Sequence, residues 1–332
     1  MENPDLEPGN GKPWWQPVST TTPRPSRIWI NGVLFIATIF TTLLTGADFL
    51  GYRWEDIFND WSLLGVGWQY SFALLLILTS HEMGHYVAAR LHGLRVTLPF
   101  YIPLPIPDAF HFGTMGAFIR IKSPMPDRRA LMDVGIAGPL AGFVVCLGVL
   151  LYGYATLPSP ELIQQHIDTV HQRMGMPPGA NAEGLTLTLG TSLLFSFFND
   201  VLAGGVVPMS EVYHFPFLFA GWIGLFITAL NLLPIGQLDG GHTVYALIGP
   251  RAWHINRLAF AGLIGMTVAF FLNRHFEAFF WVPWMVILTF IGLRHPPTMN
   301  DAVELTLSRR RLGWLCLIIF ALCFIPLPLY LQ

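Results

Sequence analysis

Charged residues are scarce in this sequence, and their scarcity limits what the protein can be. Asp, Glu, Lys and Arg make up only 11% of the 332 residues, whereas 53% are hydrophobic. Soluble domains carry about 25% charged residues, so an ordinary soluble domain is excluded. The formal net charge of −2 also argues against a nucleic-acid partner, because such proteins carry a strongly basic surface.

Cysteine is scarce as well, which excludes two kinds of cross-linked fold. The chain has 3 cysteines, Cys146, Cys316 and Cys323, and each lies in an apolar segment. Cys316 and Cys323 would share a helix but lie about 10 Å apart along its axis, too far for a disulfide. The sequence therefore offers neither a disulfide framework nor a cysteine-rich zinc module.

Long apolar segments are what the chain has instead. A helix needs roughly 17–25 residues to cross the hydrocarbon core of a bilayer. We therefore expect an all-α polytopic membrane protein with about six or seven transmembrane helices. Of the seven candidate spans, the fifth and the sixth are short. The candidate spans are Ile28–Ala47, Leu63–Leu91, Ala130–Thr156, Phe215–Pro234, Leu258–Leu272, Ala278–Leu293 and Leu312–Leu329.

The distribution of basic residues predicts the orientation of these spans. If the N-terminus is cytoplasmic and each span crosses once, only Arg53, Arg173 and Arg274 of the 18 basic residues lie outside, as the positive-inside rule expects. Residues 1–26 are polar and rich in proline, without the apolar core of a secretory signal peptide. We expect a disordered cytoplasmic tail there, and a multi-pass protein of a bacterial inner (plasma) membrane.

The rest of the chain, residues 27–330, is predicted to be a single membrane-embedded domain. Residues 96–123 contain Pro99, Pro103, Pro105 and Pro107, which exclude a continuous helix, and the other residues alternate as in extended chain. Non-helical backbone inside a bilayer must be covered by protein or line a wet cavity. A small re-entrant β-hairpin region, packed against the helices, is therefore expected.

Residues 157–214 are interpreted as an extracytoplasmic or interfacial insert. Within it, Leu193–Val207 is moderately apolar and is read as an interfacial or re-entrant helix. A full span at this position would place Asp239 on the opposite side of the membrane from His81, which argues against it.

The segment "HEMGH", residues 81–85, has the spacing of a metal site. Residues four apart share one face of a helix, so His81 and His85 can both direct a ring nitrogen at one ion. Glu82 is placed to accept a proton from water at that ion. Ionisable groups inside a span cost about 2.5–3.5 kcal/mol each, so core packing does not explain them. Gly84 leaves room for another segment to approach closely.

A hydrolytic zinc ion keeps three protein ligands and one open position. Asp239 is the natural third ligand, since it follows a span at nearly the same depth, in "NLLPIGQLDGGH" (residues 231–242), where Pro and Gly unwind the helix. A helix-capping role for Asp239 is the competing interpretation. His242 and His111 are further possible ligands, although an interfacial or supporting role suits His242 better.

Three motifs in this order resemble the site-two protease family of intramembrane zinc metalloproteases. They are "HEMGH", "DVGIAGPLAG" (residues 133–142) and "NLLPIGQLDGG" (residues 231–241), and the likeness covers about Ile28 to Gly292. The sequences "AGWIGLFITALNLLPIGQLDGGH" and "RHPP" are most similar to the branch that includes the chloroplast gravitropism-deficient proteins and their bacterial relatives.

This resemblance implies one zinc ion per chain, bound by His81, His85 and Asp239, with Glu82 as the general base. It also implies that Asn231 positions or stabilises the reacting carbonyl. The sequence departs from some branches of the family: residues 157–214 are too short for an inserted PDZ domain, no CBS domain is expected after Gly292, and the long plastid N-terminal extension is missing.

The sequence thus predicts a zinc-dependent endopeptidase that cleaves transmembrane segments of other membrane proteins. A helical substrate must unwind before cleavage, and the extended chain at 96–123 offers an edge for it to pair with. Two alternatives remain: a metal transporter that uses the same His and Asp residues, and a non-proteolytic membrane scaffold.

Overall fold

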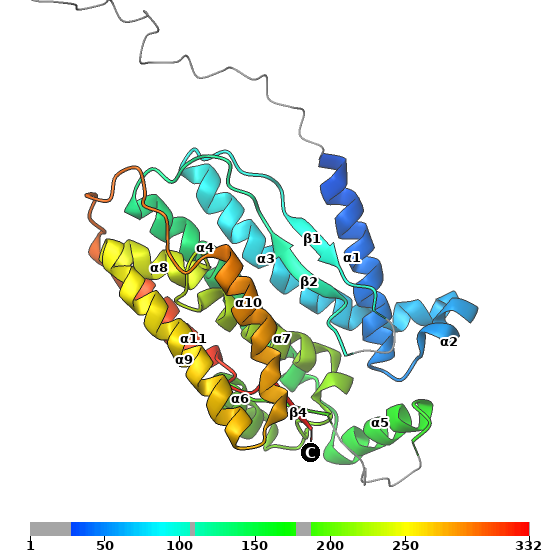
Figure 1. Ribbon diagram of the computed structural model, residues 1–332. Helices are drawn as coiled ribbons and strands as arrows, with labels where there is room; N and C mark the ends of the chain where they lie inside the picture. Colours follow the sequence, from blue (N-terminus) through cyan, green and yellow to red (C-terminus); the bar gives the residue numbers. More distant parts are fainter. Residues whose placement is uncertain (1–27, 107–109, 177–186, 332) are drawn as a thin grey trace, which may run out of the picture.

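The computed structural model describes residues 28–106, 110–176 and 187–331 (Figure 1). The predicted tail, residues 1–26, and Pro107 lie outside them. The helices are α1 Ile28–Asp48, α2 Trp54–Asn59, α3 Trp68–Leu91, α4 Arg128–Ala155, α5 Pro160–Arg173, α6 Leu193–Ala203, α7 Pro216–Leu232, α8 Asp239–Ile248, α9 Ala252–Leu272, α10 Trp281–Ile291 and α11 Leu307–Cys323. The strands are β1 Phe100–Pro103, β2 Thr114–Phe118, β3 Leu187–Leu189 and β4 Leu329–Leu331.

Among the described residues, four helical stretches are long and apolar enough to cross a membrane. They are Ile28–Asp48, Trp61–Leu91, Arg128–Ala155 and Asp239–Leu272. The first three match predicted spans closely. Helices α7, α10 and α11 are apolar but shorter, at 17, 11 and 17 residues, so the total of six or seven crossings stays a prediction.

Two predicted spans have the wrong ends. The fifth was expected to begin at Leu258, but α9 begins at Ala252, and α8 precedes it with only the 3₁₀ segment Gly249–Arg251 between them. The last was expected to reach Leu329, but α11 ends at Cys323. Pro326 and Pro328 cannot continue a helix, and the chain instead forms β4, which pairs with β3.

The predicted hairpin is confirmed as a small two-stranded antiparallel sheet. Strand β1 pairs with β2, with Tyr101 opposite Ala117. The side-chain amide of Asn31 on α1 donates to the backbone carbonyls just before β1, at 3.0 and 2.8 Å. The Tyr101 hydroxyl lies 2.7 Å from the hydroxyl of Thr79 on α3. The hairpin is therefore held between α1 and α3, so that protein covers its backbone.

Helices α3 and α4 approach each other at backbone distance. A Cβ placed on Gly84 of α3 would lie 2.3 Å from the carbonyl oxygen of Ala137 on α4. The prediction that Gly84 allows close approach is therefore confirmed. Helix α7 completes this core, where Trp222 is fully buried and donates its indole N–H to the carbonyl of Gly190 at 2.7 Å.

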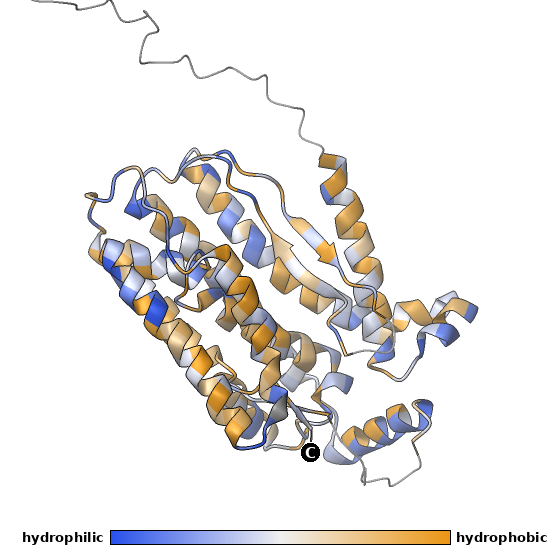
Figure 2. Cartoon of the chain, in the orientation of Figure 1, coloured by the Kyte–Doolittle hydropathy of each residue, from blue (hydrophilic) through white to orange (hydrophobic). Residues whose placement is uncertain are grey.

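The outer helices present apolar side chains outward. Figure 2 shows hydrophobic residues along α1, α9 and α10, and Leu258, Leu272 and Phe290 are among the most exposed large side chains. Continuous apolar surface of this kind is unstable in water. It is the surface that a lipid bilayer covers.

The part of the predicted insert that the structure describes contains helices α5 and α6. Helix α6 has 11 residues, so it is only about 17 Å long, too short to cross the hydrocarbon core as a straight helix. This length agrees with the interfacial or re-entrant helix expected at Leu193–Val207. Helix α6 ends at Gly204, whose left-handed backbone (φ 57°) stops the helix.

Candidate metal centre

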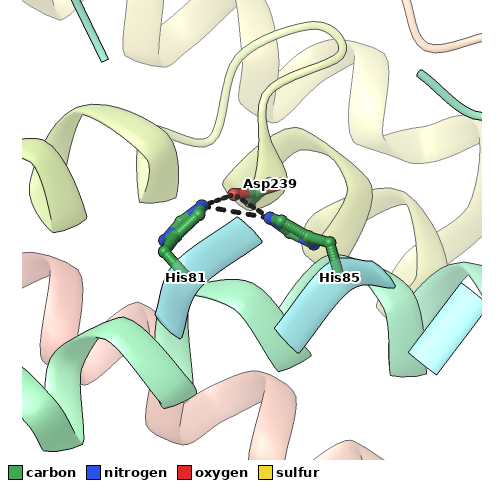
Figure 3. A group of neighbouring side chains, drawn as sticks. All are labelled: His81, His85 and Asp239. Carbon is green, nitrogen blue, oxygen red and sulfur yellow. Dashed lines mark hydrogen bonds and ion pairs between the residues drawn. The ribbon is translucent and has the colours of Figure 1, made fainter. Parts of the chain in front are cut away.

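Helix α3 and the start of α8 bring three metal-ligating side chains together. His85 Nε2 lies 3.1 Å from His81 Nε2 and 3.2 Å from Asp239 Oδ2, and His81 Nε2 lies 3.4 Å from the same oxygen. Figure 3 shows the two imidazoles and the carboxylate converging on one point. We call these three residues the His81 cluster. Both histidines are buried.

The hydrogen bonds around the cluster orient its nitrogen lone pairs. His85 Nδ1 lies 2.8 Å from the carbonyl oxygen of Val134 on α4. A carbonyl only accepts, so Nδ1 carries the proton and Nε2 directs its lone pair at the other two ligands, as is usual for metal-binding histidines. These three atoms repel one another unless a proton or a metal ion lies between them. Two imidazoles and a carboxylate form a donor set that suits zinc.

Asp239 reaches the histidines because the chain turns sharply after α7. Gly236 has a left-handed backbone (φ 57°). A Cβ on Gly240 would lie 2.0 Å from the carbonyl oxygen of Leu232, so only glycine allows this close return of the chain. The N-cap of α8 is Leu238, without a side-chain capping bond. The carboxylate of Asp239 points at the histidines instead, so the alternative capping role is not observed.

Helix α4 packs against the two histidines with glycines, which have no side chains. A Cβ on Gly138 would lie only 2.1 Å from His85 Nε2, and one on Gly142 would lie 3.0 Å from His81 Cβ. The motif in residues 133–142 entered the sequence analysis only through its family likeness. Its glycines lie three to four residues apart, a spacing that places them on one helix face, and this signal predicts a close contact on that face.

A cavity of about 270 Å³ adjoins the cluster. Glu82, buried beside His81 on α3, lines it together with Asn231, whose side-chain nitrogen lies 3.3 Å from His81 Nε2. One wall is formed by the end of β2, residues Ala117 and Phe118, and by Ile119. The predicted base, the predicted carbonyl-binding residue and the predicted ligands therefore face one space with the hairpin.

Two of the histidines considered as ligands lie outside the cluster. His111 Nδ1 accepts a hydrogen bond from the backbone N–H of Gly113 at 2.8 Å and lies near Thr45 at the end of α1. His242 lines the cavity, but its Nδ1 is 2.6 Å from His295 Nε2. His111 thus fixes the hairpin turn, and His242 belongs to the cavity wall, in the supporting role that the sequence favoured.

Comparisons with known proteins place these features in a family. The model of Peptidase family M50 matches residues 69–272. "Probable zinc metalloprotease EGY2, chloroplastic" of Oryza sativa subsp. indica is 28% identical over 326 residues, covering 94% of this chain and 52% of that protein. "Probable zinc metalloprotease EGY1, chloroplastic" of Arabidopsis thaliana is 28% identical over 257 residues, covering 77% and 42%. The chain spans about half the length of these curated relatives, and no solved structure matches it.

Proposed function

The chain belongs to peptidase family M50, the site-2 protease family, and from this membership we propose that it is a zinc-dependent intramembrane endopeptidase. Its substrates would be membrane-spanning segments of other proteins. One observation carries the proposal: two imidazoles of α3, a helix long and apolar enough to cross a membrane, lie within 3.4 Å of the carboxylate at the start of α8, beside the buried Glu82. Ionisable groups in a span are functional by default because burying them is costly.

We assign the zinc ligands to His81, His85 and Asp239. Bound there, zinc would polarise a peptide carbonyl and lower the pKa of a water molecule. Glu82 lies on α3 directly after His81 and lines the same cavity, so its carboxylate accepts the proton of the attacking water. It then delivers this proton to the leaving amide nitrogen, as a general base and acid in turn.

We assign Asn231 to the substrate carbonyl. Its side chain lines the cavity on the α7 side, and its amide nitrogen lies 3.3 Å from His81 Nε2. An amide N–H at this place can donate to the oxygen of the scissile carbonyl as negative charge develops on it. The sequence assigned this role through family likeness, and the geometry supports it.

The free edge of β2 is the proposed substrate platform. Strand β1 occupies one edge of β2 and is held against α1 by Asn31. The end of β2 lines the cavity. A substrate segment that unwinds and adds to β2 as a third strand would satisfy its own backbone groups inside the membrane and present a carbonyl to the cavity.

The proposed setting is a bacterial plasma membrane, with residues 27–330 as one embedded domain that crosses about six or seven times. The N-terminus and the end of α3 would face the cytoplasm, as the distribution of basic residues supports. The two curated relatives reported above are named chloroplastic.

Replacement of Glu82 by Gln tests the proposal. We expect cleavage of a co-expressed membrane substrate to fall by at least about 100-fold, because the amide cannot accept the proton of water, while the zinc content of the purified protein stays unchanged. The control is Glu304→Gln, which alters an exposed glutamate and should leave cleavage intact. Wild-type cleavage by Glu82→Gln would refute the assignment.

The same variant separates the protease from a metal transporter. Transport through the His81 cluster would need the ligands but not a general base, so metal flux into vesicles would survive Glu82→Gln. Family membership favours the protease. A non-proteolytic scaffold would show no cleavage by the wild-type protein either.

A further inference from the structure

A second group of metal-ligating side chains lies between α5 and the start of α7. His171 comes from the last turn of α5, Glu211 precedes the 3₁₀ helix η2 (Val212–His214), and His214 ends it. One ligand atom from each lies within 4.8 Å of the other two. We call these residues the His171 cluster. No local sequence pattern signals it, because its members are spread over 44 positions without motif spacing.

His214 is the unusual member of this cluster. Its side chain is 0% exposed, and its Nδ1 lies 2.6 Å from the carbonyl oxygen of Phe49. Nδ1 therefore donates, and a neutral ring carries its lone pair on Nε2. Among the residues that the structure describes, Nε2 makes no hydrogen bond, although Glu211 Oε2 lies 3.4 Å away.

This arrangement is unfavourable without a cation. The proton of a neutral His214 ring is on Nδ1, which donates to the Phe49 carbonyl, so Nε2 has no proton to donate to Glu211. A bare nitrogen lone pair then faces a carboxylate oxygen inside the protein, where water cannot compensate an unsatisfied polar atom. A metal ion between the two atoms would turn this repulsion into two bonds.

His171 and Glu211 are also placed to bind such an ion. His171 Nε2 lies 3.0 Å from Glu211 Oε2, so one carboxylate oxygen faces both imidazoles. The second oxygen of Glu211 accepts a hydrogen bond from the Ser210 hydroxyl at 3.3 Å. The side chains of His171 and Glu211 are 21% and 15% exposed, so water can reach the cluster and complete a coordination shell.

We propose that His171, Glu211 and His214 bind a divalent metal ion of the zinc class, separate from the His81 cluster. Two imidazole nitrogens and a carboxylate oxygen are typical zinc donors, and His214 has the backbone-carbonyl contact on its other nitrogen that metal-binding histidines commonly make. The two clusters are far apart. Gly138 of α4 lies next to His85, whereas α4 ends at Ala155, shortly before α5 begins. These two positions on α4 are about 25 Å apart along the helix.

The metal ion would fasten α5 to the membrane domain. Helix α5 buries only Ile163, Ile167 and Val170. In addition, the Arg173 side chain reaches the turn after α1. There it donates to the Leu50 carbonyl at 3.2 Å and lies over the Tyr52 ring. The ion would join α5 to η2 and, through His214 and Phe49, to that same turn. Figure 1 shows α5 at the edge of the molecule, below α2.

Metal analysis of the purified full-length protein tests the inference. After exposure to zinc and removal of the excess, we expect about two zinc ions per chain in the wild type and about one in His171→Ala. Glu211→Gln keeps the shape of the side chain but removes its charge, and should weaken zinc binding at this cluster at least about 10-fold. His254→Ala is the matched control: His254 lies at an exposed position on α9, and the variant should retain both ions.

The Asp239→Ala variant distinguishes this inference from the proposed function. If the His171 cluster binds zinc, Asp239→Ala retains one ion, and adding His171→Ala removes it, whatever the role of the His81 cluster. Hydrogen exchange gives a second readout: a chelator should speed exchange in α5 of Asp239→Ala and have no further effect in the double variant. Equal zinc in wild type, His171→Ala and Glu211→Gln would overturn the inference.

Discussion

The His81 cluster and the His171 cluster contain the same ligand types in very different surroundings. Each has two histidines and one carboxylate, and in each one histidine directs Nδ1 at a backbone carbonyl, at 2.8 Å for His85 and 2.6 Å for His214. The His81 cluster joins the long helix α3 to the start of α8, lies against glycines of α4 and opens on a cavity that is lined by Glu82. The His171 cluster joins a helix end to a 3₁₀ turn near the surface.

The difference teaches that the ligands alone do not determine what a metal site does. Donor atoms set which ion is bound, whereas the neighbouring base, the cavity and the rigidity of the support set whether chemistry follows. On this basis the His81 cluster is the catalytic candidate and the His171 cluster a structural one. Substitutions of residues around the ligands, with all ligands left in place, test this interpretation.

The largest effect on cleavage is expected from a substitution of Gly138, on the face of α4 that contacts His85. Gly138→Ala places a methyl group 2.1 Å from the position of His85 Nε2, so the ring must move away from Asp239. We expect zinc to be lost from the His81 cluster only, and cleavage to fall below detection because no metal then remains to activate water. Cleavage assays and metal analysis measure both.

Gly148→Ala on the same helix is the matched control for Gly138→Ala, since a Cβ there meets no atom within 4 Å. It should behave like the wild type, apart from a small gain in helix propensity. Equal activity in the two variants would show that His85 does not need this surface.

A smaller effect is expected from Asn231→Ala, which removes the proposed donor to the substrate carbonyl and leaves the ligands in place. Loss of one such donor lowers kcat by about 100–1,000-fold in other enzymes; because Asn231 also contacts His81, zinc content must be measured in parallel. Asn273→Ala, at the exposed end of α9, is the control. Unchanged kcat in Asn231→Ala, with zinc bound, would remove Asn231 from the mechanism.

The smallest effect is expected at the polar contact that ties α11 to α4. Arg309 donates to both carboxylate oxygens of Asp133, at 2.8 and 2.7 Å, in a partly exposed position. Arg309→Gln should lower the free energy of unfolding by about 1 kcal/mol, since solvent screens such a pair, with cleavage nearly unchanged. Arg310→Gln, whose exposed contact to Glu304 spans 3.6 Å, should have no measurable effect. Denaturant unfolding in detergent compares them, and equal stability would contradict this account.

The sequence predicted the parts of the site that depend on local geometry. His81 and His85 share a helix face because they lie four residues apart, and the structure places both of them with Asp239 as expected. Asp239 was predictable because few acidic residues lie at membrane depth. The hairpin was predictable because closely spaced prolines exclude a helix.

Features that depend on tertiary contacts were not predictable in this way. An apolar window does not show where a helix starts, so the helical structure before Leu258 was missed. The pairing of β3 with β4 joins segments about 140 residues apart along the chain, which no local pattern signals. The His171 cluster was missed for the same reason, because tertiary contacts bring together residues that have no motif spacing along the chain.

The contact between Gly84 and Ala137 has a mechanical consequence. With their backbones already touching, α3 and α4 cannot slide past or approach each other, so this pair is the fixed frame of the molecule. A substrate helix about 10 Å wide must then reach the cavity by displacing other parts. The hairpin contacts α3 through side chains such as Tyr101, whose hydroxyl lies 2.7 Å from that of Thr79. We therefore expect the hairpin to move aside while His81, His85 and Asp239 keep their positions.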